Sequence, residues 1–200
     1  MSRLRSALLW GLLAIVVVVS VIAAVMSPLL EFRSPVYISA GFAGVFGLVL
    51  LLFQPILAAG YLPVLSARRA RHVHRWVGSL LVLSVIVHVA GLWITSPPDV
   101  IDALLFASPT PFTVWGVIAM WAVFAAACLA LWRGKMGVSR WRWSHKTLVV
   151  VIVAGTVVHA MLIDGTMETI SKAALCVLVI AATGLMLAGF KPGQKSATVA

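Results

Sequence analysis

The sequence predicts an all-α integral membrane protein, a six-transmembrane-helix bundle with both termini in the cytoplasm. Three observations predict this fold. Hydrophobic residues make up 62% of the 200 residues, charged residues only 10%, and the mean hydropathy is +1.12. A soluble domain of this length could not cover so much apolar surface. The apolar residues also form six long runs, and most Lys and Arg residues gather in alternate loops between these runs.

Each of the six runs is long enough to cross a hydrocarbon core of about 30 Å. The length of the linkers leaves no room for a second domain, so residues 1–200 are expected to form a single transmembrane domain. The first run could instead be a signal peptide, but it is longer than the usual apolar segment of about 7–15 residues, which favours a spanning helix. We expect helices near 7–26, 36–58, 74–95, 112–132, 145–164 and 171–190.

The basic residues orient the chain in the membrane. When alternate loops are assigned to opposite sides, all Lys and Arg residues except Arg33 and Lys172 fall on the side of the termini, which is thirteen of the fifteen. All five acidic residues fall on the other side. Because short cytoplasmic loops carry an excess of Lys and Arg, we expect a multi-pass protein of a bacterial-type inner (plasma) membrane with cytoplasmic termini. The net charge of +10 is then a topology signal and predicts no nucleic-acid partner.

Four histidines form the candidate site. His74 and His88 are fourteen residues apart in the third run, and His145 and His159 are fourteen apart in the fifth. On a helix this spacing leaves the two side chains about 40° apart around the axis and about 21 Å apart along it. Both helices run outward, so His74 matches His145 in depth and His88 matches His159. Two facing imidazoles suit the two axial positions of a haem iron, so the four histidines are predicted to bind two stacked b haems.

Other interpretations of these residue types remain open. Each histidine could form only a hydrogen bond between helices. His72 lies about 160° around the helix from His88 and is expected to be solvated, with a substitute inner ligand as the lesser alternative. Cys128 and Cys176 lie inside apolar runs without the spacing of metal ligands and are interpreted as inert thiols.

Residues beside the histidines have two possible roles. Gly78 and Gly155 lie near the ligand face, where a missing Cβ would let a flat macrocycle approach, but ordinary helix packing explains them equally well. Arg75 and Lys146 lie at the depth of cytoplasmic-side haem propionates, which a cation can pair. Anchoring at the cytoplasmic interface explains these two cations as well.

Four further polar or aromatic side chains lie near the candidate site. Gln54, at mid-membrane depth, is expected to hydrogen-bond to a neighbouring helix. Trp76, Trp141 and Trp143 are expected to belong to an interfacial aromatic belt, with stacking on a porphyrin as the lesser possibility.

These motifs resemble the ferric-reductase-like transmembrane domain family, which includes the membrane parts of ferric reductases and NADPH oxidases and the haem-binding subunit of the bacterial methionine sulfoxide reductase system. The resembling residues are HRWVG at 74–78 with His88, and WSHK at 143–146 with His159, within a core of about 36–190. The resemblance implies six helices, b haems between the third and fifth, and transmembrane electron transfer. Many members continue into flavin- and NAD(P)H-binding domains, whereas this chain ends about ten residues after its last predicted helix. FMN or FAD is therefore expected from a partner.

Together, the residues and the resemblance predict the haem-binding electron-transfer subunit of an oxidoreductase. A cytoplasmic flavin or NAD(P)H reductase, or a quinol, would donate electrons. Ferric iron, oxygen or a periplasmic reductase partner outside would accept them. A b561-like or quinol-oxidising cytochrome b subunit is the alternative, and a non-haem transporter or assembly factor is less favoured because no acidic residue lies at the membrane midplane. The sequence contains no zinc, phosphate-loop or dinucleotide motif.

Overall fold

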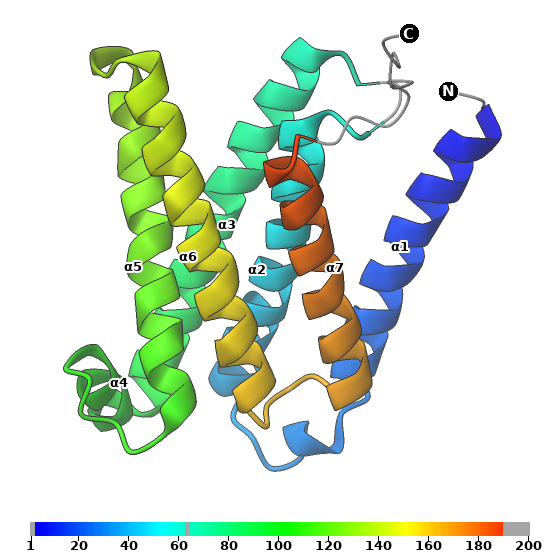
Figure 1. Ribbon diagram of the computed structural model, residues 1–200. Helices are drawn as coiled ribbons and strands as arrows, with labels where there is room; N and C mark the ends of the chain where they lie inside the picture. Colours follow the sequence, from blue (N-terminus) through cyan, green and yellow to red (C-terminus); the bar gives the residue numbers. More distant parts are fainter. Residues whose placement is uncertain (1–2, 63–64, 190–200) are drawn as a thin grey trace, which may run out of the picture.

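The computed structural model describes residues 3–62 and 65–189, which form helices joined by loops (Figure 1). No strand occurs in these two ranges, so the predicted all-α fold is confirmed there. The helices are α1 (Arg3–Val25), α2 (Pro35–Ala59), α3 (Ala67–Thr95), α4 (Pro97–Leu104), α5 (Pro111–Trp132), α6 (Val138–Leu162) and α7 (Thr169–Leu187), with short 3₁₀ turns η1 (Pro28–Leu30) and η2 (Arg133–Lys135).

Five helices are long and apolar enough to cross a membrane, namely α2, α3, α5 extended through η2, α6 and α7. They coincide with the second to sixth predicted spans, as expected of a multi-pass membrane protein. α1 covers the first predicted span, but it is not one of these five. The sixth crossing therefore stays a prediction.

Two helices begin earlier than their apolar runs. α3 begins at Ala67 rather than near 74. Its N-cap is Ser66, whose hydroxyl accepts a hydrogen bond of 3.3 Å from the backbone N–H of Arg69. α6 begins at Val138 rather than near 145. Both helices extend beyond their apolar runs because hydropathy marks the entry into the hydrocarbon, whereas a helix can continue into the polar residues beside it, as α3 does from its cap at Ser66. His74 and His145 therefore each lie two turns inside a helix.

Helix α4 lies between the third and fourth predicted spans, in a segment framed by prolines. Pro97 and Pro98 occupy its first turn. Backbone N–H groups have no intrahelical partner there, so proline, which lacks an N–H, costs no hydrogen bond. Asp99 lies in the same turn and accepts a hydrogen bond from the Ser96 hydroxyl. Its negative charge also interacts favourably with the helix N-terminus. These local features stabilise a short helix that hydropathy alone does not detect.

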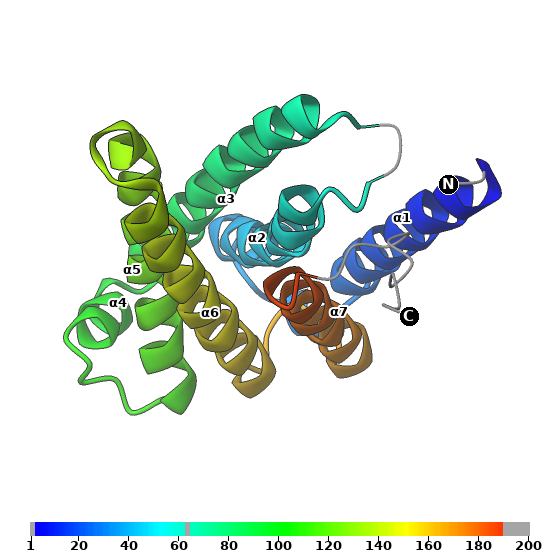
Figure 2. The ribbon, with the colours of Figure 1, turned by 45° about the horizontal axis from the view of Figure 1, so that its top comes forward.

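Two helix pairs and α7 build the bundle. α3 packs mainly against α2 and α6 mainly against α5, while α7 packs against both α2 and α6, with α1 at the periphery (Figure 2). Leu52 of α2 and Leu175 and Val179 of α7 are the largest fully buried side chains. Large apolar side chains on the outer helix faces, such as Phe46 and Leu83, are exposed, as expected where a helix faces lipid rather than water.

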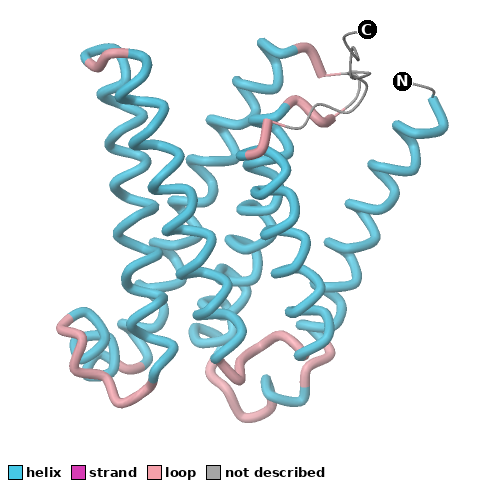
Figure 3. The backbone as a smooth tube through the Cα atoms, in the orientation of Figure 1, coloured by secondary structure: helices cyan, strands magenta, loops and turns pink. Residues whose placement is uncertain are grey.

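The loops lie at two opposite ends of the bundle (Figure 3). The α2–α3 and α5–α6 connections lie at the end that we name the basic end, and the η1 turn, α4 and the α6–α7 loop lie at the acidic end (Figure 1). This arrangement agrees with the predicted alternation of loops, and the cytoplasmic location of the basic end stays a prediction. The basic end contains Arg68, Arg69, Arg71, Arg75, Arg133, Lys135, Arg140, Arg142 and Lys146, and the acidic end contains Glu31, Asp99, Asp102, Asp164 and Glu168.

Candidate functional site

The structure brings the four histidines together as two pairs, each with one ring from α3 and one from α6. The ring centroids of His74 and His145 are 6.5 Å apart, with an angle of 74° between the ring planes. Those of His88 and His159 are also 6.5 Å apart, with an angle of 82°. All four side chains are half-buried. We refer to His74 and His145, toward the basic end, as the inner pair, and to His88 and His159 as the outer pair.

The outer pair is anchored to helices that carry no candidate ligand. His88 Nδ1 lies 2.7 Å from the backbone oxygen of Ala40 in α2, and His159 Nδ1 lies 2.8 Å from the backbone oxygen of Phe112 in α5. Because a carbonyl oxygen only accepts hydrogen bonds, Nδ1 carries the proton in both rings. In the neutral ring Nε2 then keeps its lone pair, which is the form of histidine that binds a metal.

His74 of the inner pair is anchored in the same way. Its Nδ1 lies 3.2 Å from the backbone oxygen of Gln54 in α2. The Gln54 side-chain amide donates in return to the backbone oxygen of His74, at 3.4 Å. The predicted interhelical hydrogen bond of Gln54 is thus confirmed. The neutral Nδ1–H form with a free Nε2 therefore applies to three of the four rings.

His145 is held by stacking instead. Its Nδ1 is buried without a hydrogen-bond partner in the described part of the chain, and so is the indole Nε1 of Trp141. The Trp141 ring stacks on the His145 ring, with centroids 5.4 Å apart and planes 11° from parallel. The Arg133 guanidinium lies 5.4 Å from the centre of the indole. Trp141 was expected in the interfacial belt, but the structure places it half-buried against a histidine of the inner pair.

The separation of 6.5 Å discriminates between two uses of each pair. A direct N–H···N bond requires about 2.7–3.2 Å between the nitrogens and would bring the ring centroids closer. No such bond joins the rings of either pair. Two imidazole nitrogens that each bind one shared metal ion at about 2.0–2.1 Å place their ring centroids at a separation of this size. The distance therefore favours a shared metal over an interhelical hydrogen bond.

The donor set of each pair fits a haem better than a free metal ion. Within the described ranges, no group of three or more His, Cys, Asp or Glu side chains could hold a metal ion. Each pair offers two imidazoles, which suffice only when a macrocycle supplies the other ligands, as in a haem. The residues present thus fit the predicted cofactor.

The two predicted glycines face neighbouring helices. A Cβ added to Gly155 would lie 3.0 Å from the backbone oxygen of Trp115 and 3.1 Å from the Cβ of Ala119, both in α5. A Cβ added to Gly78 would lie 3.5 Å from the Gln54 amide nitrogen in α2. These contacts favour helix packing, one of the two interpretations that the sequence left open for both residues.

The two predicted cations lie at the basic end and are exposed. The Arg75 guanidinium lies 3.4 Å from Nδ1 of His72, and Lys146 follows His145 in α6. Trp76 donates a hydrogen bond of 2.9 Å from its indole nitrogen to Nε2 of His72. His72 is exposed and lies outside both pairs, in agreement with its predicted solvation.

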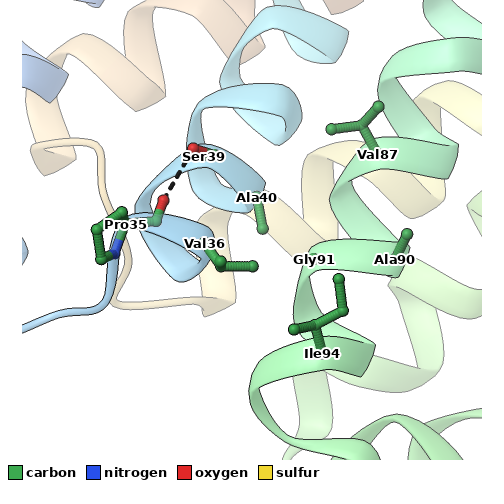
Figure 4. A pocket seen from close by; sticks show the side chains of 8 residues that line it. All are labelled: Pro35, Val36, Ser39, Ala40, Val87, Ala90, Gly91 and Ile94. Carbon is green, nitrogen blue, oxygen red and sulfur yellow. Dashed lines mark hydrogen bonds between the residues drawn. The ribbon is translucent and has the colours of Figure 1, made fainter.

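An apolar groove lies between α2 and α3 near the outer pair (Figure 4). Its one polar side chain, Ser39, donates a hydrogen bond of 2.8 Å to the backbone oxygen of Pro35. Ala40 lines the groove, and its carbonyl accepts the hydrogen bond of His88. The groove presents no metal-ligating side chain, and the Ser39 hydroxyl is bound to the backbone, so the groove is not part of the candidate site.

Two glycines that contact the outer histidines were missed by the sequence analysis. A Cβ added to Gly44 would lie 3.1 Å from Nδ1 of His88, and one added to Gly116 would lie 2.7 Å from Nδ1 of His159. They lie on α2 and α5, which carry no histidine. The only sequence signal for them is a glycine in the interior of an apolar helix, where it is less favourable than alanine.

Comparison with known proteins identifies one family. A family model described as "Ferric reductase like transmembrane component" matches residues 40–156, which is more than half of the chain. The matched segment includes His74, His88 and His145 and ends three residues before His159. No curated protein and no solved structure matches the chain. The protein therefore belongs to the family of ferric reductase like transmembrane components.

Proposed function

We propose that this protein is a di-haem b cytochrome that passes electrons across the membrane from the basic end to the acidic end. It would act as the haem-binding subunit of a ferric-reductase-like oxidoreductase. The observation that carries the proposal is the presence of two facing histidine pairs at two depths, each with ring centroids 6.5 Å apart. Membership of a family of ferric reductase like transmembrane components supports the same chemistry.

His74 and His145 would hold one haem, and His88 and His159 the other. The hydrogen bonds from Nδ1 of three rings to helix carbonyls support this assignment, because they fix each ring and leave Nε2 for the iron. Stacking on Trp141 gives His145 a fixed orientation by another route. Arg75 and Lys146, next to the inner ligands and exposed at the basic end, would pair with haem propionates there.

A bound haem supplies an iron that accepts and releases one electron at a time. His74 with His145, and His88 with His159, would contribute two imidazoles to each haem. Two imidazole ligands suit electron transfer rather than oxygen binding at the metal. Three of the four rings are held by backbone oxygens of α2 and α5, which limits their movement when the charge of the site changes.

The charges at the two ends support the direction of transfer. The basic end, cytoplasmic by the positive-inside rule, would receive electrons from a flavin or NAD(P)H reductase that supplies FMN or FAD, or from a quinol. Its Lys and Arg residues favour a donor with an acidic or phosphate-bearing surface. The acidic end would face an acceptor outside, namely ferric iron, oxygen or a periplasmic reductase partner.

The first test is a dithionite-reduced minus oxidised absorption spectrum of the purified protein, with haem measured per chain. We expect a b-type α-band and two haems per chain. His74→Ala should lose the inner haem, and His88→Ala should lose the outer haem. His72→Ala is the control, because His72 is exposed and lies outside both pairs, and it should retain both haems. A protein without haem, after expression with ample haem, contradicts the proposal. Loss of haem in His72→Ala but not in His74→Ala would indicate a different ligand set, as in another type of cytochrome b.

A further inference from the structure

A backbone carbonyl inside a helix is difficult to reach for a side chain of another helix. The carbonyl of residue i already accepts the hydrogen bond of the N–H four residues later. Its second lone pair opens onto the helix surface close to the side chain of that later residue. A ring that binds this lone pair must therefore lie against the position of the later side chain.

At both outer histidines this position is a glycine. His88 binds the carbonyl of Ala40, and Gly44 follows four residues later. His159 binds the carbonyl of Phe112, and Gly116 again follows four residues later. α2 and α5 thus present the same arrangement, a bound carbonyl and a glycine one turn after it.

A side chain at either glycine would meet the ring directly. A Cβ at Gly116 would lie 2.7 Å from Nδ1 and 2.9 Å from Cε1 of His159, distances at which the ring must shift. A Cβ at Gly44 would lie 3.1 Å from Nδ1 and 3.2 Å from Cε1 of His88, where the ring is crowded. An alanine at position 116 would therefore disturb His159 more than an alanine at position 44 would disturb His88.

The inner pair offers a comparison within the same molecule. His74 binds the carbonyl of Gln54, and the residue four positions later is Ala58. This hydrogen bond measures 3.2 Å, against 2.7 Å and 2.8 Å at the two outer histidines. The shorter bonds thus occur where the later residue is glycine. Gly116 is also the one glycine of α5, in a helix interior where alanine is the more favourable residue.

We propose that Gly44 and Gly116 are positioning residues of the outer site. They let His88 and His159 lie against the helix backbone, so that the hydrogen bond of each Nδ1 directs Nε2 toward the iron. This inference rests on the proposed haem-binding function and extends it to residues of α2 and α5 that do not themselves bind the metal.

Alanine substitutions test the proposal through haem content and redox potential. We expect Gly116→Ala to lower the haem affinity of the outer site by about 10- to 100-fold, and Gly44→Ala to lower it less. The outer haem that remains should show a raised midpoint potential, because a ring without its Nδ1–H···O=C bond donates less electron density to the iron. The potential of the inner haem should stay unchanged. Gly47→Ala is the matched control, because its Cβ would lie 3.7 Å from Leu81 and Ser84, an ordinary contact.

A second measurement does not depend on haem. In the full chain labelled with ¹⁵N-histidine, side-chain nitrogen spectra should show the Nδ1–H form for His88 and His159 in the parent protein, and a mixture of forms for His159 in Gly116→Ala. A parent chain without haem would refute the proposed function, while these spectra would still test the glycines. If both variants match Gly47→Ala in haem content, outer potential and ring protonation, the inference is overturned. If Gly116→Ala does not fold, Gly44→Ala is compared with Gly47→Ala in haem content, outer potential and ring protonation, and equal values in these two variants overturn the inference.

Discussion

His145 is held differently from the other three histidines of the site, and the difference lies in one neighbouring residue. His74, His88 and His159 donate Nδ1–H to carbonyls of a neighbouring helix. His145 has no such bond, and the parallel ring of Trp141 on its own helix is its observed support. Since residues four apart on a helix lie on the same face, α6 provides this support without help from α5.

Replacement of Trp141 should therefore affect the inner site alone. We expect Trp141→Leu to lower the haem affinity of the inner site by about tenfold or more, because His145 loses the contact that orients it. The outer haem should be retained. Haem per chain and the reduced-minus-oxidised spectrum measure both effects. Trp143→Leu is the control, since that indole is 72% exposed, and equal haem loss in the two variants would contradict the prediction.

Gln54 contacts His74 through both its backbone and its side chain, and the two contacts should differ in importance. Gln54→Leu removes the amide bond to the backbone oxygen of His74 but leaves the carbonyl that accepts from the ring. We expect the free energy of unfolding in detergent to fall by about 0.6 kcal/mol, typical of a hydrogen bond between membrane helices. Both haems should remain bound. Loss of the inner haem in this variant would show that the side chain, not the carbonyl, positions His74.

At the scale of helices, local signals predicted the elements and nonlocal contacts were missed. The fourteen-residue spacing aligned His74 with His88 correctly because both lie on one helix, whose geometry is constant. The start of α3 at Ala67 was missed because Ser66 acts as a cap outside the apolar run. The roles of the Ala40 and Phe112 carbonyls could not be predicted, because every residue has a carbonyl and only the packing of two helices selects one. Gly44 and Gly116 were missed for the same reason.

The N-terminus of α7 gives a prediction about pH. Glu168 accepts hydrogen bonds from the backbone N–H groups of Ile170 at 2.7 Å and Ser171 at 3.0 Å, which lowers the pKa of this carboxyl below its ordinary value of 4.5. These bonds exist only in the folded state, so the folded pKa lies below the unfolded pKa. The stabilisation is then fully present above the ordinary value and is lost as the pH falls through the lowered pKa.

Glu168→Gln should accordingly reduce thermal stability at neutral pH. The difference from the parent protein should shrink below about pH 4.5, because the protonated parent carboxyl then resembles the neutral amide. Thermal unfolding in detergent across this pH range measures the effect. Glu31→Gln is the control, since the exposed Glu31 side chain caps no helix. A stability difference for Glu168→Gln that stays constant down to the lowest pH would contradict the assigned cap.

At the scale of the whole molecule, the site lies between two units that are each closely packed. α2 with α3 supplies two histidines and the carbonyls that hold them, and α5 with α6 supplies the other two histidines and one carbonyl. Each ring of the outer pair is thus positioned within its own unit. The sequence predicted which histidines match in depth from the direction of the helices. It could not predict that the neighbour of each histidine-bearing helix orients the rings.

The separation of charge between the ends predicts the topology and can be tested on the whole chain. In a background without Cys128 and Cys176, single cysteines at the acidic end, as in Asp102→Cys, should react with a membrane-impermeant maleimide added to intact bacterial cells with a permeable outer layer. Arg140→Cys at the basic end should react only after the inner membrane is opened, since Lys and Arg mark the cytoplasmic side. The opposite pattern would reverse the direction of electron transfer that we propose.

The same labelling decides whether α1 is the sixth span. Its predicted crossing places residues 3 and 31 on opposite sides of the membrane, because its 23 helical residues rise about 35 Å at 1.5 Å each. Glu31→Cys should then be labelled in intact cells and Arg3→Cys should be protected until the membrane is opened. If both cysteines are labelled in intact cells, α1 lies along or outside the membrane, and the bundle has the five spans that its longest apolar helices provide.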